Sequence, residues 1–146
     1  MNDVFEKYRI SLRGILDSFL VNPILILMLK VKLTPNAVTI LGFIICCISA
    51  YYISSGSFLV GGLLVLFSGF LDIFDGALAR KINHITDKGA FLDSTFDRLS
   101  EAIVLIALIY YFSNSNETNF VLLTSVSLVF SLLISYLRAR IEGLGY

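Results

Sequence analysis

Four aspartates in the middle of the chain are the residues whose type and spacing best suit chemistry. Asp72 and Asp75 are three residues apart and Asp93 and Asp97 are four apart, so each pair shares one helix face. A short turn over residues 81–88 folds the second helix beside the first, which brings the two pairs together. Carboxylates in apolar helices are costly and usually face an interior site. Four of them repel one another unless cations neutralise them, and two divalent ions would balance the charge.

The chemistry of these donors predicts the metal and the kind of substrate. Only oxygen ligands are offered, with no Cys or His cluster in reach, and this favours Mg²⁺ or Mn²⁺ over zinc. Two such ions are suited to stabilising the charge on a diphosphate while a bridging oxygen leaves. Gly76 and Gly89 permit close approach of a ligand, and Arg80 beside the carboxylates is a phosphate partner. We therefore expect a phosphorylated substrate.

The elements that position these residues must lie in lipid. Of the 146 residues, 57% are hydrophobic and 15% charged, and the mean hydropathy is +0.86. The net charge is zero and there is no run of basic residues, so nucleic acid is not expected as a partner. Cys46 and Cys47 are adjacent in an apolar stretch, where we interpret them as small apolar side chains without a disulfide.

The apolar segments predict an all-α membrane protein, a transmembrane helical bundle with four visible spans. A span takes about 20 residues, and residues 35–54, 58–79, 90–112 and 119–137 meet this length. Pro35 suits the first turn of a helix, with Thr34 as its N-cap. Residues 14–30 are shorter and include Asp17, Asn22 and Pro23, so we expect an amphipathic helix at the membrane surface instead of a fifth span.

The basic residues predict the orientation of the bundle. With four spans, segments 1–34, 80–89 and 138–146 share one side and hold ten of the eleven Lys and Arg residues. By the positive-inside rule this side is cytosolic. We therefore expect a multi-pass protein of the cell membrane whose active site faces the cytosol.

The aspartates belong to a longer pattern with eight fixed positions over residues 72–97, Asp-x2-Asp-Gly-x2-Ala-Arg-x8-Gly-x3-Asp-x3-Asp. This pattern resembles the signature of the CDP-alcohol phosphotransferases. The segment Leu33-Thr34-Pro35-Asn36 also resembles the entry to the first transmembrane helix of that family. The matched positions are Asp72, Asp75, Gly76, Ala79, Arg80, Gly89, Asp93 and Asp97.

The resemblance implies a transferase that moves a phosphatidyl-type group from a CDP-linked lipid to an alcohol and releases CMP. All four aspartates would hold two metal ions, and Asp97 would also be the general base that takes the proton of the acceptor hydroxyl. The residues implied for binding the CDP-linked lipid are Thr34, Pro35, Asn36, Ala37, Gly76, Arg80, Thr86 and Gly89.

The end of the fourth span bears on the acceptor. Its sequence, 135–145, resembles the branch that makes phosphatidylinositol phosphate or archaetidylinositol phosphate, so inositol phosphate is the expected acceptor. Arg138 and Arg140 would hold the phosphate of this anionic acceptor, or would only anchor the helix at the headgroups. Glycerol phosphate remains an alternative acceptor. The resemblance also implies a homodimer.

The resemblance predicts six membrane helices where this sequence offers four, so we expect a chain truncated after its fourth span. It divides into a juxtamembrane segment, 1–33, and a transmembrane catalytic domain, 34–146. Glu101 either faces the same cavity as Asp97 or only supports Arg98. Two other classes use similar residues: membrane prenyltransferases bind a diphosphate through Asp-rich helices, and cation or proton transporters use intramembrane carboxylates near the bilayer midplane.

Overall fold

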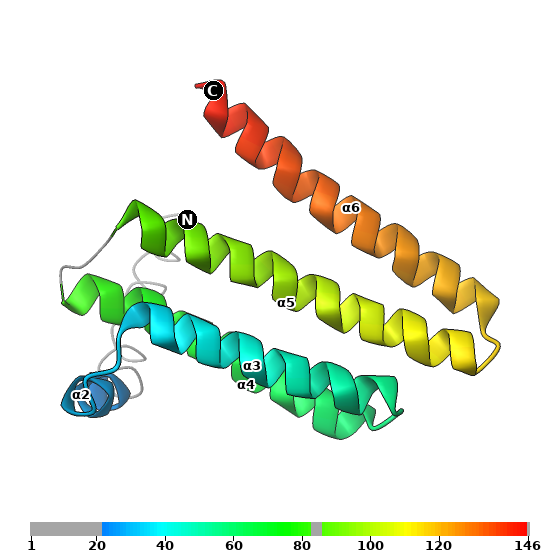
Figure 1. Ribbon diagram of the computed structural model, residues 1–146, viewed down its shortest axis with the longest axis horizontal. Helices are drawn as coiled ribbons and strands as arrows, with labels where there is room; N and C mark the ends of the chain where they lie inside the picture. Colours follow the sequence, from blue (N-terminus) through cyan, green and yellow to red (C-terminus); the bar gives the residue numbers. More distant parts are fainter. Residues whose placement is uncertain (1–21, 83–85, 146) are drawn as a thin grey trace, which may run out of the picture.

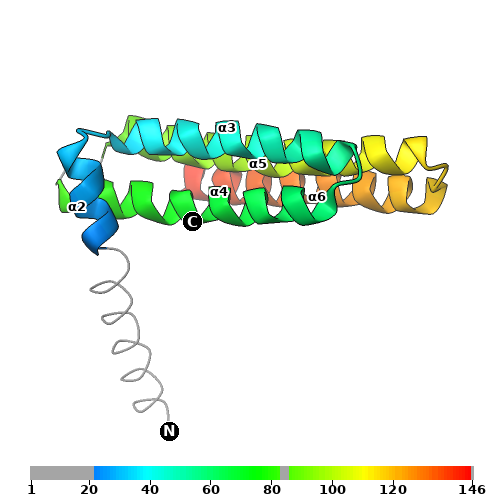
Figure 2. The same ribbon diagram turned by 90° about the horizontal axis from the view of Figure 1, so that it is seen from below.

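In the computed structural model, residues 22–82 and 86–145 are described, and their regular structure is entirely helical. Four long helices run up and down alongside one another, and a short helix crosses one end of the bundle (Figures 1 and 2). The expected all-α bundle is therefore confirmed. The helices are α2 (Asn22–Lys30), α3 (Pro35–Ser54), α4 (Phe58–Lys81), α5 (Asp87–Asn114) and α6 (Thr118–Gly143).

The long helices cover the residues of the four expected spans, but in the described part of the chain three of them, not four, suit a membrane span by composition. α3 has the expected bounds, whereas α4 and α6 continue past the apolar segment to Lys81 and Gly143. Backbone hydrogen bonding continues into the polar flanks because it does not depend on apolar side chains. By length and composition α3, α4 and α6 can each cross a membrane. α5 has the length, but its first half carries Asp93, Asp97 and other charged residues.

Helix α2 lies across the end of the bundle that carries the aspartates (Figure 2). Its one buried side chain, Leu25, packs in a cluster with Val38 of α3 and with Phe74 and Leu78 of α4. The Nζ of Lys81 donates a hydrogen bond to the side-chain oxygen of Asn22 at 2.8 Å. The expected amphipathic helix over 14–30 is described from residue 22 onward only, because its earlier part lies outside the described residues. Its place at the membrane surface stays a prediction.

Helices α3 and α4 approach closely through small residues. The Ser49 hydroxyl is fully buried and donates to the carbonyl of Gly61 at 2.7 Å. Farther along, the Ser68 hydroxyl donates to the carbonyl of Gly42 at 2.8 Å. A Cβ on Gly61 would lie 2.5 Å from Cγ1 of Ile53, so only glycine allows this spacing. Small residues let membrane helices pack backbone to backbone, and the hydroxyls tie the pair together.

The other helices attach through larger side chains. Phe43 of α3 meets Phe96 of α5 with the ring centroids 5.1 Å apart. Phe112 of α5 stacks on Phe120 of α6 at 5.0 Å, and Thr124 is the one buried residue of α6. From this contact α6 diverges from α5 toward its own C-terminal end (Figure 1). The two cysteines are free, as expected.

Candidate active site

Three of the four predicted metal ligands are brought together by α4 and α5. Asp72 and Asp75 lie near the end of α4 and Asp93 lies near the start of α5, and each offers an oxygen within 4.8 Å of the others. Asp75 is the most enclosed, with 4% of its surface exposed. Asp97 lies one turn farther along α5, outside this group. The predicted convergence is therefore seen for three carboxylates, with the fourth beside them.

Asp97 belongs to a cavity of about 360 Å³ between α3, α4 and α5. Asp72 lines the same cavity, so the two aspartates face a shared space. The rest of the wall is mostly apolar, interrupted by a few polar side chains. These are Thr39, Ser68, Ser100 and Glu101.

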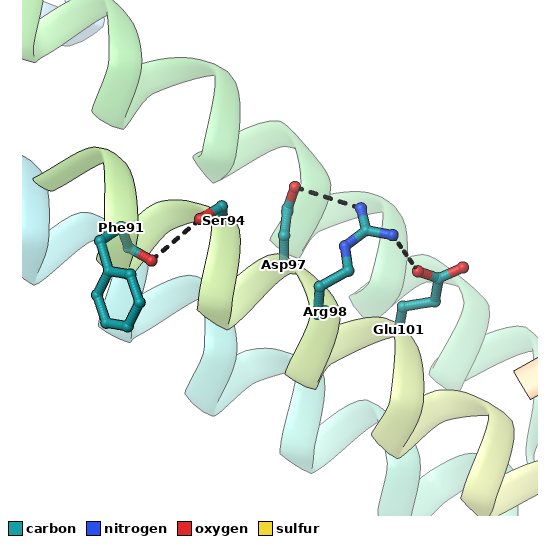
Figure 3. A network of polar contacts seen from close by, with 5 residues as sticks. All are labelled: Phe91, Ser94, Asp97, Arg98 and Glu101. Atoms are coloured by element: carbon teal, nitrogen blue, oxygen red, sulfur yellow. Dashed lines mark hydrogen bonds and ion pairs between the residues drawn. The ribbon is translucent and has the colours of Figure 1, made fainter. Parts of the chain in front are cut away.

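A short ionic network flanks Asp97 (Figure 3). Arg98 lies 3.8 Å from the carboxylate of Asp97 and donates to Glu101 at 2.7 Å. Earlier on the same helix, the Ser94 hydroxyl donates to the carbonyl of Phe91. Glu101 therefore supports Arg98 and also lines the cavity, so the two expectations for this residue are compatible.

A second cavity, of about 240 Å³, lies where the starts of α3 and α5 meet the end of α4. Asp75 and Asp93 form its acidic side. Six of the eight positions predicted to bind the CDP-linked lipid line it: Pro35, Asn36, Gly76, Arg80, Thr86 and Gly89. The remaining two, Thr34 and Ala37, lie outside the lining. There the Thr34 hydroxyl accepts a hydrogen bond from the Ala37 amide at 3.3 Å and caps α3, as predicted for Thr34.

The two signature glycines allow close approaches within the protein at this cavity. Thr86 caps α5 by accepting a hydrogen bond from the Gly89 amide at 3.1 Å. A Cβ on Gly89 would lie 3.1 Å from the Thr86 hydroxyl and 3.6 Å from the side-chain oxygen of Asn36. A Cβ on Gly76 would lie 3.4 Å from Nη1 of Arg80. Side chains at either position would crowd the groups that line the cavity.

Thr39 is a site residue that the sequence did not single out. Its hydroxyl donates to the carboxylate of Asp75 at 2.6 Å, and of the residues lining the two cavities it is the one shared by both. The only local signal was a hydroxyl side chain one helical turn after Pro35 in an otherwise apolar segment. The contact joins residues 36 positions apart and depends on the pairing of α3 with α4, which spacing along one helix does not reveal.

The two arginines predicted to bind the acceptor are not part of either cavity. Arg138 pairs instead with Glu142 one turn along α6, at 3.0 Å, and 82% of its side chain is exposed. Helix α6 does return toward the end of the bundle that carries the aspartates (Figure 1). The C-terminal part of α6, which carries both arginines, diverges from α5 (Figure 1).

The donor set fits the predicted metals. Every ligand in the Asp72, Asp75 and Asp93 group is a carboxylate oxygen, which hard divalent cations such as Mg²⁺ and Mn²⁺ prefer. Like charges this close are unfavourable without a cation. Such a cluster in a helical membrane bundle, flanked by Arg80 and a cavity, offers the ligands that a site for divalent cations and phosphate needs.

The chain belongs to the CDP-alcohol phosphatidyltransferase family, whose model matches residues 32–143. It is 34% identical over 145 residues to an archaetidylinositol phosphate synthase of Methanothermobacter thermautotrophicus. It is 37% identical over 120 residues to a phosphatidylinositol phosphate synthase of Mycobacterium tuberculosis. The family match does not favour the prenyltransferase and transporter alternatives.

Solved structures of the mycobacterial synthase share the fold. The structure with CDP-DAG bound superposes with a TM-score of 0.82 at 36% identity, covering 86% of this chain and 64% of that one. The structure in complex with manganese and citrate gives a TM-score of 0.83, also at 36% identity and covering 86% of this chain. The chain spans 70% of the archaeal synthase, 55% of the curated mycobacterial synthase and 59% of an uncharacterized protein of Aquifex aeolicus that is 40% identical.

Proposed function

We propose that this chain transfers a phosphatidyl-type group from a CDP-linked lipid to inositol phosphate and releases CMP. The observation that carries the proposal is that two cavities sharing Thr39 are each lined by two of the four aspartates. Asp75 and Asp93 face the cavity with the predicted nucleotide residues, while Asp72 and Asp97 face the other. A transfer between two substrates needs such a shared centre, because both must reach the same phosphorus atom.

The residues divide the reaction between them. The smaller cavity would hold the cytidine diphosphate, with Arg80 as a charged partner of its phosphate oxygens. Divalent ions held by Asp72, Asp75, Asp93 and Asp97 would supply charge stabilisation on the diphosphate. Asp97 would accept the proton from the acceptor hydroxyl, whose oxygen forms a new bond to the β-phosphorus. The bond from that phosphorus to the CMP oxygen breaks, and CMP leaves.

The acceptor proposal rests on the relatives and on charge. Both named relatives are inositol-phosphate-type synthases, one archaeal and one bacterial. Arg138 and Arg140 are proposed to attract the acceptor phosphate, supported by the return of α6 toward the aspartate end of the bundle (Figure 1). Glycerol phosphate is the second candidate, because it carries the same charged group on a smaller polyol.

We further propose that the aspartate end faces the cytosol. The helix ends and turns at this end hold Lys30, Lys32, Arg80, Lys81 and Lys88, whereas the turns at the opposite end, 55–57 and 115–117, hold no basic residue. This asymmetry is the pattern that the positive-inside rule associates with cytosolic loops. The homodimer implied by the resemblance stays a prediction.

An assay of CMP release tests the proposed reaction. Membranes containing the chain are supplied with a CDP-linked lipid, Mg²⁺ or Mn²⁺, and one of four acceptors: inositol phosphate, glycerol phosphate, inositol or serine. We expect release with inositol phosphate above the other three. Asp97→Asn should lower the rate by about 10²- to 10⁴-fold, the usual contribution of a general base.

The outcomes separate the proposals. Release that is fastest with glycerol phosphate would keep the reaction and change the acceptor. Release that is equal without any acceptor, or unchanged in Asp97→Asn, would contradict the transfer mechanism. Thr95→Val on the same helix is the control, because its hydroxyl bonds the backbone of Phe91 and no other described residue, and it lies outside both cavities.

A further inference from the structure

Thr39 makes a contact that the proposed reaction does not use. Its hydroxyl donates to a carboxylate oxygen of Asp75 at 2.6 Å, across the boundary between α3 and α4. The same hydroxyl lies 3.2 Å from the carbonyl of Pro35, its partner one turn back. A hydroxyl has one proton to donate, and the shorter contact to the charged acceptor is the stronger of the two. The Thr39 hydroxyl therefore donates its hydrogen bond to Asp75.

Of the three clustered aspartates, Asp75 has the greatest need of a hydrogen-bond donor. It is nearly fully buried, whereas Asp72 is exposed and Asp93 is intermediate in exposure. A buried carboxylate needs hydrogen-bond donors to hold one orientation. An ionised carboxylate has about four lone-pair sites, so the Thr39 bond leaves others for a cation.

We propose that Thr39 is a positioning residue for the metal site, holding Asp75 in the orientation in which it meets Asp72 and Asp93. This inference rests on the proposed function, because it concerns the ions that the reaction would use. Groups that orient metal ligands typically contribute 10- to 100-fold in metal affinity. The contact also ties the ligand group to α3, a helix that carries none of the clustered aspartates.

Direct binding of Mn²⁺ tests this role without relying on catalysis. The whole chain, purified in detergent and freed of metal, is titrated with Mn²⁺ while free Mn²⁺ is followed by its electron paramagnetic resonance signal. Thr39→Val keeps the branched shape and removes the hydroxyl, so we expect its Kd to rise by about 10- to 100-fold. Thr39→Ser keeps the hydroxyl and should bind Mn²⁺ nearly as the parent chain does.

Thr124→Val is the matched control. It makes the same chemical change on α6, where the Thr124 hydroxyl donates to the carbonyl of Phe120 at 2.7 Å and to no other group among residues 22–82 and 86–145. Its Mn²⁺ affinity should be unchanged. In the CMP assay, saturating Mn²⁺ should restore most of the rate of Thr39→Val, because positioning affects how tightly the metal binds.

Three results would overturn the proposal. Thr39→Val could bind Mn²⁺ as tightly as the parent chain, or Thr39→Ser could lose as much affinity as Thr39→Val. A variant that loses its helical circular dichroism together with Mn²⁺ binding would assign Thr39 to folding instead of positioning. If the parent chain itself bound no Mn²⁺, the metal site and the proposed function would fail together, and this outcome is distinct from the other three.

Discussion

The three helices around the aspartates and the last helix of the chain are held in different ways. α3 and α4 meet through Gly61, Ser49 and their neighbours, with buried hydroxyls bonded across the boundary. α5 joins them through Phe96 and the site itself. By contrast, α6 rests on α5 with a single buried residue, Thr124. Close packing is therefore found between two helices that position the carboxylates, and looser packing on the helix that carries none of the clustered ligands.

The difference indicates which part of the chain sets the geometry of the site. Asp72 and Asp75 can meet Asp93 only if α4 and α5 keep one relative position, and α3 contacts both of them. Small residues achieve this in lipid, where burial of apolar side chains gives no driving force between helices and packing must replace it. Helix α6 carries none of the clustered aspartates, so its position does not affect how they meet.

The largest effect is expected from neutralising a clustered ligand. Asp93→Asn removes the one carboxylate that α5 contributes to the three-aspartate group. Because groups that only orient metal ligands contribute 10- to 100-fold, loss of a ligand itself should weaken Mn²⁺ binding and CMP release by at least about 100-fold. Asp87→Asn makes the same change six residues earlier on α5, outside the group and both cavities, and should alter both measurements little. Equal losses in the two variants would mean that bulk charge, and not the cluster, is responsible.

The next largest effect is expected from a substitution that disturbs the close contact between α3 and α4. In Gly61→Val the added Cβ would lie 2.5 Å from Cγ1 of Ile53 and 3.2 Å from the carbonyl oxygen of Ser49. Forcing side-chain atoms into a packed contact costs about 1–3 kcal/mol. Thermal unfolding in detergent should show this loss, whereas Gly62→Val should not, because nothing lies within 4 Å of a Cβ at Gly62. Similar midpoints for the two variants would contradict tight packing here.

Much of the helix arrangement and of the candidate site could be predicted from the sequence. Spacing along single helices placed Asp72 with Asp75 and gave the start of α3 at Pro35, because helical periodicity and capping are local properties. The motif also located six of the residues around the second cavity. Contacts between helices were not predictable in this way. Neither the bond from Thr39 to Asp75 nor the fit of Gly61 against Ile53 leaves a periodic signal, since each depends on the register between two helices.

Arg138 gives a second example of a feature that depends on how two helices pack and that the sequence alone does not predict. Its charge and its place at the end of the fourth span predicted a role at the acceptor, and sequence alone could not show the angle at which α6 leaves α5. α6 begins beside the end of α5, where Phe112 stacks on Phe120, and the arginine lies at the other end of the helix. A small rotation there displaces the arginine by a large distance.

The smallest effect is therefore expected at the end of α6. Arg138→Gln and Glu142→Gln both break the exposed ion pair at 3.0 Å, and neither should change unfolding by more than about 0.5 kcal/mol. They differ in the charge that remains at the end of α6, because one removes a positive charge and the other a negative one. If Arg138 attracts the acceptor phosphate, its loss should raise KM for inositol phosphate by about tenfold, since a hydrogen bond to a charged group contributes about 1.5 kcal/mol. Glu142→Gln releases Arg138 from its ion pair, so KM for inositol phosphate should stay the same or fall. Equal KM values in the two variants would mean that Arg138 only anchors the helix. The described residues that determine the site would then all lie on or beside α3, α4 and α5.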